Sequence, residues 1–468
     1  MSTSAHAVAA AAAVAGARAE TVEPGKSRPN IIHIVTHDIG TDLGCYGHPD
    51  VKTPNLDRLA AEGVRFTNCF CASTACSPSR GTTMTGRYAH SNGLMGLAHL
   101  GWSLPEGEKT ITDYLNDVGY VTVHAGFQHE RHDRSRNSYQ VLLGEDWTKR
   151  FEDSYIDVAV DRVVEYLEGH SGGPFYVNLG SFECHQPWGK RSEYDAFNTY
   201  DPESTVVPPH VNDAGGIRRT LCSYYATISF MDAQVGRLLS ALRILDLEDN
   251  TVVLFTTDHG CSFPRAKGTL YDAGVRICLI LRWPGTIPSG ATLSELIHTV
   301  DVLPTLLAMI GERKPPIVQG RSFWPLLQGK AFEPYEQVFM ERNGHDFLDF
   351  VRAVRTMRYK YIRNYTQRNR EMMPSDDPDE CNWHRLRDSG IPRPYEELYD
   401  LDEDPNEFRN VADAPKYDEV LADMRQRLER WMDETDDPLR GARSFIHNPK
   451  DDILYRNLAE DTDAESTG

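Results

Sequence analysis

The chain lacks several features that would assign it to other classes of protein. No segment holds the roughly 20 consecutive apolar residues that a membrane-spanning helix needs, so we expect no membrane partner of that kind. The nine cysteines follow no zinc-type spacing, and the 468 residues contain no internal repeat. Positive charge is in deficit, because the 49 Lys and Arg residues are outnumbered by 69 Asp and Glu residues. The resulting formal net charge of −20 argues against a nucleic-acid partner.

The first 27 residues are rich in alanine, and Ala17-Arg-Ala-Glu20 resembles the cleavage region of a signal peptide. No Lys or Arg precedes the alanine run, so a disordered tail is an equal alternative. The compartment is therefore left open between the cytoplasm and the periplasm or secretion.

Length and patterning predict an α/β chain with a large and a small domain, because 468 residues exceed one ordinary core. Apolar runs predict buried strands at residues 31–35, 174–179, 252–255 and 277–281. Helices are predicted from Pro54 to Gly63, with Thr53 as its cap, and over residues 301–310.

From about residue 334 the pattern changes. Short strands are expected at 359–362 and 397–400, an amphipathic helix at 417–434, and a surface excursion or pocket rim at 364–394. The predicted division is a tail or signal segment at 1–27, a catalytic domain at 28–333, a C-terminal domain at 334–440 and a tail at 441–468.

The most informative segment is Cys76-Ser-Pro-Ser-Arg80, which continues into Gly81-Thr-Thr-Met-Thr-Gly-Arg87. In a helix, Ser77 to Arg80 would form the first turn, whose unpaired backbone N–H groups and dipole favour an anion. Pro78 suits that turn because its missing donor has no helical partner there. Arg80 adds a forked cation that matches a tetrahedral oxyanion. The segment predicts an anion site beside Cys76, although a buried cysteine before an ordinary helix has the same pattern.

Two distant apolar runs end in an aspartate. Ile31 to Val35 leads to Asp38, and Val252 to Phe255 leads to Asp258. Ligands of open α/β sheets collect beyond the carboxyl ends of the strands, and Ca²⁺ and Mg²⁺ prefer carboxylate oxygens. The pair predicts a divalent-cation site, while an Asp after a strand also commonly serves as a turn residue or helix cap.

Together these motifs resemble a type I sulfatase of the alkaline phosphatase superfamily. The resemblance rests on Arg28-Pro-Asn-Ile-Ile32, the Asp38 turn, the Cys76 segment, Asp258-His-Gly260 and Lys267-Gly-Thr-Leu-Tyr271, and it spans roughly residues 28 to 440. Two segments are similar to the heparan N-sulfatase (sulfamidase) branch: residues 90–99, and residues 397–438 with their Glu397-Leu-Tyr-Asp400 start. The resemblance implies an alkaline phosphatase-like sandwich, with a large mixed, mostly parallel sheet between helices and a smaller C-terminal α+β domain.

The resemblance also implies a role for each matching residue. Cys76 would be oxidised by a formylglycine-generating enzyme to formylglycine, whose hydrated aldehyde attacks sulfur and also binds the metal. Asp38, Asp258 and His259 would be the other protein ligands of Ca²⁺, or of Mg²⁺ or Mn²⁺. Around the sulfate, Arg80 holds the formylglycine and the sulfate, His129 orients the aldehyde hydrate, His185 protonates the leaving group and Lys267 contacts the sulfate.

The chain departs from the family pattern at two positions. His37 stands where the family usually has a second aspartate, and imidazole suits transition metals better than Ca²⁺. Phe127 stands where the family has a lysine of the sulfate pocket, so this cation is missing or comes from His124, Arg131 or His132. Neither change removes the nucleophile, and we expect an active enzyme with altered tuning.

We therefore predict a sulfatase that removes sulfate, from an ester or a sulfamate, on a sulfated carbohydrate or related small molecule. Its partners would be that substrate and the formylglycine-generating enzyme, and the sequence allows a homo-oligomer. Two alternatives remain open. One is a phosphonate or phosphate monoester hydrolase with the same nucleophile motif. The other is a non-catalytic protein that binds sulfated glycans, which His37 and Phe127 make conceivable.

Overall fold

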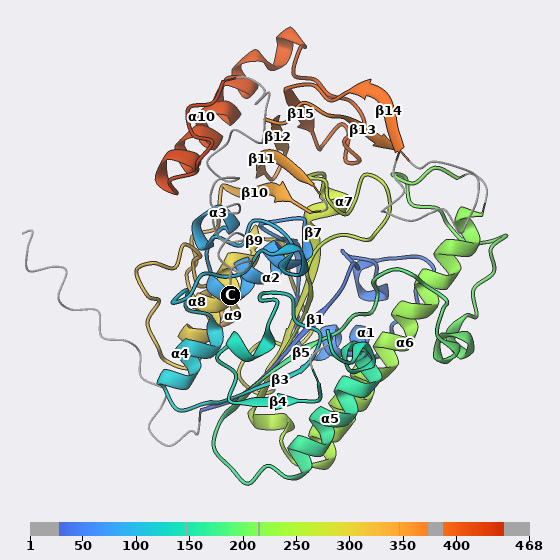
Figure 1. Cartoon of the computed structure of the whole chain (residues 1–468), viewed down its shortest axis with the longest axis vertical. Helices are drawn as coiled ribbons and strands as arrows, with labels where there is room; N and C mark the ends of the chain where they lie inside the picture. The colour runs from blue at the N-terminus through green and yellow to red at the C-terminus, as the bar shows by residue number, and fades with distance from the viewer. Residues whose placement is uncertain (1–27, 146–147, 214–215, 346, 373–386, 444–468) are drawn as a thin grey trace, which may run out of the picture.

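A nine-stranded sheet forms the centre of the larger part of the molecule (Figure 1). The computed structural model describes residues 28–145, 148–213, 216–345, 347–372 and 387–443. The strand order is β4-β3-β5-β1-β6-β7-β2-β8, with β9 beside β2, and only β7 runs antiparallel to its neighbours. The strands are β1 (Asn30–Thr36), β2 (Val64–Phe70), β3 (Val121–Gly126), β4 (Val141–Leu143), β5 (Phe175–Gly180), β6 (Thr251–Thr257), β7 (Arg276–Arg282), β8 (Ala291–Leu293) and β9 (Ile297–His298).

Helices cover both faces of this sheet, so its central strands are apolar on both sides. In β1, Ile32 belongs to the core under α1, α5 and α6, and Ile31 belongs to the opposite core under α2, α4 and α8. Figure 1 shows α5 and α6 on one side of the sheet and α4 and α8 on the other. The helices are α1 (Pro54–Glu62), α2 (Cys76–Thr85), α3 (Ala89–Asn92), α4 (Ile111–Asp117), α5 (Ile156–Glu168), α6 (Ile217–Ile244), α7 (Asp272–Val275), α8 (Val302–Met309) and α9 (Trp324–Leu327).

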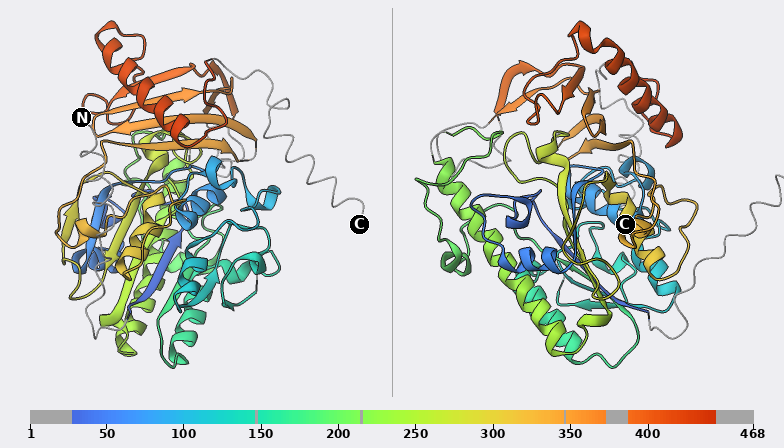
Figure 2. Two further views of the ribbon diagram at one scale, coloured as in Figure 1. Left: turned by 90° about the vertical axis from the view of Figure 1, so that its left-hand side faces the viewer. Right: turned by 180° about the vertical axis from the view of Figure 1, so that it is seen from behind.

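A second, antiparallel sheet stands at one end of the molecule (Figure 2). Its order is β10-β11-β12-β15, and α10 packs against β11 and β12 through the core that contains Tyr361 and Leu428. The elements of this region are β10 (Gln337–Gly344), β11 (Leu348–Thr356), β12 (Tyr359–Asn364), β15 (Glu396–Asp400), α10 (Asp418–Glu434) and the pair β13 (Asn369–Met372) and β14 (Arg387–Pro392).

Most predicted elements are confirmed, and the predicted α/β class is confirmed with them. The strands at 31–35, 174–179, 252–255 and 277–281 are β1, β5, β6 and β7, and the helices at 301–310 and 417–434 are α8 and α10. Thr53 precedes α1 as expected, but its hydroxyl bonds Asp57 and the Gly44 N–H instead of capping the helix.

The structure adds strands to the prediction and leaves its tails and domain boundary untested. The two strands β10 and β11 were not predicted. The predicted excursion at 364–394 includes the pair β13 and β14, and its residues 373–386 lie outside the described residues. The tails at 1–27 and from 444 onward also lie outside them, and the domain boundary at 333/334 stays a prediction.

Candidate active site

Four neighbouring parallel strands each lead into a segment that carries a predicted site residue. The strands β3, β5, β1 and β6 are hydrogen-bonded in that order, and their ends Gly126, Gly180, Val35 and Thr256 are in register. After these ends come Phe127 and His129, then His185, then His37 and Asp38, then Asp258 and His259. The carboxyl ends of parallel strands meet at one edge of a sheet, which explains how residues distant in sequence converge.

The strand ends approach one another closely. A side chain at Gly180 would place its Cβ 1.6 Å from the Phe127 carbonyl oxygen, so only glycine fits there. On the next strand, the His37 N–H donates to the Glu183 carbonyl over 2.9 Å, and the Cys184 N–H donates to the His37 carbonyl over 2.8 Å. These bonds place the segment that carries His185 directly beside His37.

The fifth contribution comes from helix α2, whose first residue is Cys76. Ser79 Oγ donates to the Asp258 carbonyl over 2.5 Å, and Arg80 Nε lies 3.3 Å from Asp258 Oδ2. Arg80 Nη2 also donates to the Thr36 carbonyl over 3.1 Å. The first turn of α2 is thereby bound to the ends of β1 and β6, and the Cys76 side chain points toward them.

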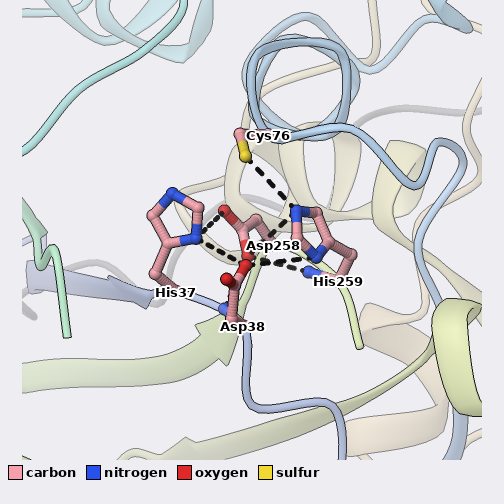
Figure 3. A group of neighbouring side chains, drawn as sticks. All are labelled: His37, Asp38, Cys76, Asp258 and His259. Atoms are coloured by element: carbon pink, nitrogen blue, oxygen red, sulfur yellow. Dashed lines mark hydrogen bonds and ion pairs between the residues drawn. The ribbon is translucent and has the colours of Figure 1, made fainter. Parts of the chain in front are cut away.

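Figure 3 shows the resulting group of five buried side chains, which we call the central cluster: His37, Asp38, Cys76, Asp258 and His259. One ligand atom from each lies within 4.8 Å of all the others. His37 Nδ1 is 2.7 Å from Asp38 Oδ1 and 3.2 Å from Asp258 Oδ2, and His259 Nε2 is 3.5 Å from Cys76 Sγ. The predicted ligands Asp38, Cys76, Asp258 and His259 are therefore together, and His37 joins them.

The donor set of the central cluster fits a divalent cation. Two carboxylates and two imidazole nitrogens converge on one point, and each is a metal ligand in its ordinary form. Although burial alone would raise the pKa of Asp258, His259, His37 and Arg80 hold it below its ordinary value. Burial likewise opposes ionisation of Asp38, but Lys267 and His37 hold its pKa well below the ordinary value. Both carboxylates are therefore anionic.

The thiol of Cys76 is not reactive as it stands. Burial raises its pKa to about 12, with the nearby aspartates adding to the effect and Lys267 opposing it. The thiolate is the nucleophilic and metal-binding form of cysteine. A neutral thiol at this position is therefore a poor nucleophile and a poor ligand, and the chemistry of the site depends on what Cys76 becomes.

Lys267 and Arg80 supply the cations of the site. Lys267 Nζ lies 3.0 Å from Asp38 Oδ1 and 2.8 Å from Asp38 Oδ2, and its side chain is buried. Burial would lower the pKa of Lys267, but Asp38 raises it above its ordinary value. The lysine is charged, and it stands beside the central cluster as the sequence predicted.

His129 and His185 flank the cluster on the side of His37. The His185 ring lies 4.7 Å from the His37 ring, and its Nδ1 is 2.6 Å from the Gln186 carbonyl, so Nε2 is the nitrogen that remains for a substrate proton. His129 Nε2 is 2.8 Å from His99 Nδ1. His99 was not predicted as a site residue, and nothing in its local pattern marks it.

The place of the missing lysine is occupied by an aromatic ring. The Phe127 ring lies 5.4 Å from the His37 ring and 5.1 Å below the Arg80 guanidinium. The predicted substitutes lie elsewhere: His124 packs against Tyr139, Arg131 is bound to the Leu104 and Pro105 carbonyls, and His132 is exposed. Arg80 thus lies over the Phe127 ring in a cation–π contact.

Comparison with known proteins agrees with this geometry. The family model described as Sulfatase matches residues 29–312, and that of the N-sulphoglucosamine sulphohydrolase C-terminal region matches residues 263–388. An Ulvan-active sulfatase of Formosa agariphila is 32% identical over 422 residues, which cover 86% of this chain and 80% of that protein.

Solved structures share the fold. One, in complex with its substrate D-glucosamine-2-N,6-O-disulfate, has a TM-score of 0.72 at 20% identity and covers 89% of this chain and 100% of its own. A phosphonate monoester hydrolase from Silicibacter pomeroyi has a TM-score of 0.71 at 19% identity and covers 90% of this chain and 98% of its own. None of the described helices combines the length and apolar composition that crossing a membrane requires. On the family model and the Formosa relative, the chain belongs to the sulfatase family.

Proposed function

We propose that this sulfatase removes sulfate from a sulfated carbohydrate, as an ester or a sulfamate, through formylglycine formed from Cys76. The observation that carries the proposal is the position of Cys76, at the first turn of α2 and inside a cluster of metal ligands. Hydrated by water, formylglycine would carry two hydroxyls: one would attack sulfur and displace the alcohol or amine, and loss of the proton of the second to a neighbouring base such as His129 would re-form the aldehyde and release sulfate. The proposal requires a formylglycine-generating enzyme as a partner during maturation.

The residues around Cys76 would divide the work of binding sulfate. Arg80 and Lys267 are the two buried cations that reach the central cluster, and each now touches one carboxylate, Asp258 and Asp38 respectively. A bound cation would neutralise part of the sulfate charge as a Lewis acid. Lys267, which is buried beside the central cluster, would contact a sulfate oxygen there, and the exclusion of water would strengthen this contact.

His185 would be the general acid for the leaving group. Burial lowers its pKa well below the ordinary value, and Lys267 adds to this effect. The ring is therefore neutral in the present state, and an anionic sulfate beside it favours its protonated form. His129 would orient the aldehyde hydrate, and the pairing of its Nε2 with His99 Nδ1 would fix the orientation of the His129 ring.

The cation would be divalent, with Ca²⁺, Mg²⁺ and Mn²⁺ as the candidates. The imidazoles of His37 and His259 make this donor set softer than the all-oxygen cages that Ca²⁺ prefers. We propose that Asp38, Asp258, His259 and the modified Cys76 hold the ion, with His37 as a further ligand that shifts the preference toward Mn²⁺.

A carbohydrate substrate is supported by the surroundings of the site. The segments that carry His99 and His129 also line a cavity of about 880 Å³, whose walls include Trp102, Arg131 and Arg136. Cavities of this size accept drug-sized and sugar-sized ligands. The Formosa relative is named for activity on ulvan, and the solved structure above holds a sulfated glucosamine.

The test compares three substrates that carry the same aryl group: an aryl sulfate and an aryl phosphonate, which release a phenol, and an aryl sulfamate, which releases an arylamine. We expect sulfate or sulfamate turnover to exceed phosphonate turnover, with formylglycine present in the Cys76 peptide by mass spectrometry. Phosphonate turnover above both would favour the hydrolase represented by the Silicibacter structure. A modified Cys76 without turnover of any sulfate would leave a glycan-binding protein.

A further inference from the structure

The segment that carries Lys267 is attached to the C-terminal region by several side chains, in addition to its own turn bonds. Residues 265–272, here called the lysine segment, lead from β6 into α7. Its main chain makes local turn bonds, such as those from the Lys267 N–H to the Cys261 carbonyl over 3.0 Å and from the Thr269 N–H to the Ala266 carbonyl over 3.0 Å. The position of the Lys267 ammonium group depends on the position of this segment, because the side chain extends from the segment to the central cluster.

Lys360 on β12 is the centre of the attachment. Its side chain is fully buried, and its Nζ donates to the Leu270 carbonyl over 3.0 Å. The same ammonium group pairs with Asp272 and lies 3.0 Å from Glu407 Oε1. One buried cation from the C-terminal sheet thus holds the lysine segment at two points and a loop of its own region at a third.

Glu407 and Arg355 complete the network. Glu407 Oε2 accepts from the Asp272 N–H over 2.5 Å, and its carbonyl accepts from Arg265 Nη2 over 2.7 Å, at the other end of the lysine segment. Arg355 Nη2 lies 3.0 Å from Asp272 Oδ2. Two cations, Lys360 and Arg355, thus face two carboxyl groups, Asp272 and Glu407, in one closed network of buried contacts.

A further contact reaches the residue next to Lys267. Arg342 on β10 donates from Nη1 to the Gly268 carbonyl, and the same Nη1 lies 3.1 Å from Asp349 on β11. The peptide that follows Lys267 is therefore held by a guanidinium group that is itself anchored in the C-terminal sheet.

We infer that the buried Lys360–Asp272–Glu407 network positions Lys267 for sulfate binding, so that the C-terminal sheet is a working part of the active site. The inference rests on the proposed role of Lys267 as a sulfate contact. Lys360 and Glu407 touch no reacting atom and would act only through the lysine segment. A misplacement of about 1 Å in a catalytic group can cost about 100-fold in rate.

The test removes the network without leaving a buried charge alone. The double variant Lys360→Met/Glu407→Gln deletes one charge of each sign and preserves side-chain length. We expect kcat/KM to fall about 10- to 100-fold, equally for an aryl sulfate and a sulfated sugar, because a sulfate contact is made whatever the leaving group. Amide hydrogen exchange in residues 265–272 should become faster.

Two comparisons separate positioning from general loss of stability. On a Lys267→Ala background, the same pair of substitutions should change kcat/KM for the aryl sulfate by less than about 2-fold, since the group to be positioned is gone. Arg363→Met is the matched control, because Arg363 is a buried cation on the same strand that faces α10 through Glu429. It should lower the melting temperature without changing kcat/KM or exchange in the lysine segment.

Full additivity on the Lys267→Ala background, or an equal loss of kcat/KM in Arg363→Met, would overturn the inference. So would wild-type kcat/KM in the double variant. These outcomes are distinct from failure of the proposed function, which would appear as absence of sulfate hydrolysis by the wild-type enzyme.

Discussion

Among the described residues, two clusters of histidine and carboxylate side chains have spacing suited to a metal, and they differ in the arginine and lysine side chains that pair with their carboxylates. The second, which we call the C-terminal cluster, consists of His90, Glu341 and Asp437. His90 Nδ1 lies 3.0 Å from Glu341 Oε2 and 3.7 Å from Asp437 Oδ2. By ligand spacing alone, it resembles the central cluster.

The difference lies in Arg352. Its guanidinium group lies 2.5 Å from Asp437 Oδ2 and 3.6 Å from Glu341 Oε2, so one permanent cation bridges both carboxylates of the C-terminal cluster. In the central cluster, Arg80 touches Asp258 and Lys267 touches Asp38, so among the described residues each carboxylate has its own arginine or lysine partner. Ligand spacing is therefore insufficient evidence for a metal, and the position of the resident cations decides between a metal site and an ion-pair network.

The largest expected effect concerns Cys76, the proposed precursor of the nucleophile, because the central cluster contains a cysteine and the C-terminal cluster does not. Cys76→Ala should lower kcat by more than about 10⁴-fold, as loss of a nucleophile does. Peptide mass spectrometry of the active wild type should show an aldehyde in place of the Cys76 thiol. The control is Cys45→Ala, a half-buried cysteine outside both clusters, which should retain activity. Full activity in a preparation that holds only unmodified Cys76 would contradict the assignment.

The next prediction concerns metal content. Elemental analysis should find one divalent ion per chain, and Asp258→Ala should lose both the ion and the turnover, while Asp437→Asn should retain the ion. Titration calorimetry should show tighter binding of Mn²⁺ than of Ca²⁺, and His37→Asp should strengthen Ca²⁺ binding by about 10-fold or more, because it restores an oxygen ligand. Activity that survives exhaustive chelation, with no ion found, would rule out the metal site.

A smaller effect distinguishes the two groups that flank the central cluster. His185→Ala should slow a sulfated sugar by about 10²–10⁴-fold, the usual contribution of general acid catalysis, and should slow an activated nitrophenyl sulfate far less. Lys267→Ala should slow both substrates alike, because it contacts the sulfate and not the leaving group. Equal losses for the two substrates in His185→Ala would leave this histidine as a binding residue only.

The smallest effect on activity is expected in the C-terminal cluster, where the consequence is for stability. Although burial would raise it, His90 and Arg352 lower the pKa of Glu341 from 4.5 to about 2. The stabilisation is complete above pH 4.5 and is lost as the pH falls toward 2, a contribution of about 3 kcal/mol. Denaturant titrations should show a larger acid-dependent loss in the wild type than in Glu341→Gln, since Asp38 and Asp258 contribute the same loss in both proteins. An equal loss in both proteins would place the titrating group elsewhere.

Much of the central cluster could be predicted from local sequence. Asp38 and Asp258 follow short apolar runs, and the Cys76 segment has the residues of an anion-binding first helical turn, so strands and ligands were recognisable separately. The strands β10 and β11 were missed for a physical reason. Glu341 and Arg342 are buried in β10 because each has a partner from elsewhere in the fold. Glu341 pairs with His90, which is distant in sequence, and Arg342 pairs with Asp349 on β11. No local alternation of apolar and polar residues marks such a strand.

The sequence by itself determined the α/β class, the strands β1 and β6 and the chemical types of the site residues, because these depend on neighbours within a few positions. Only the tertiary structure decided that Asp38 and Asp258, 220 residues apart, share a hydrogen bond of 3.1 Å, since the order of strands in a sheet is set by packing and not by any local pattern. The same holds for the cations. Nothing in the local sequence marks Arg352, and the motif that marks Lys267 does not say which carboxylate it meets. Only the tertiary structure places Arg352 across both carboxylates of the C-terminal cluster and Lys267 beside Asp38.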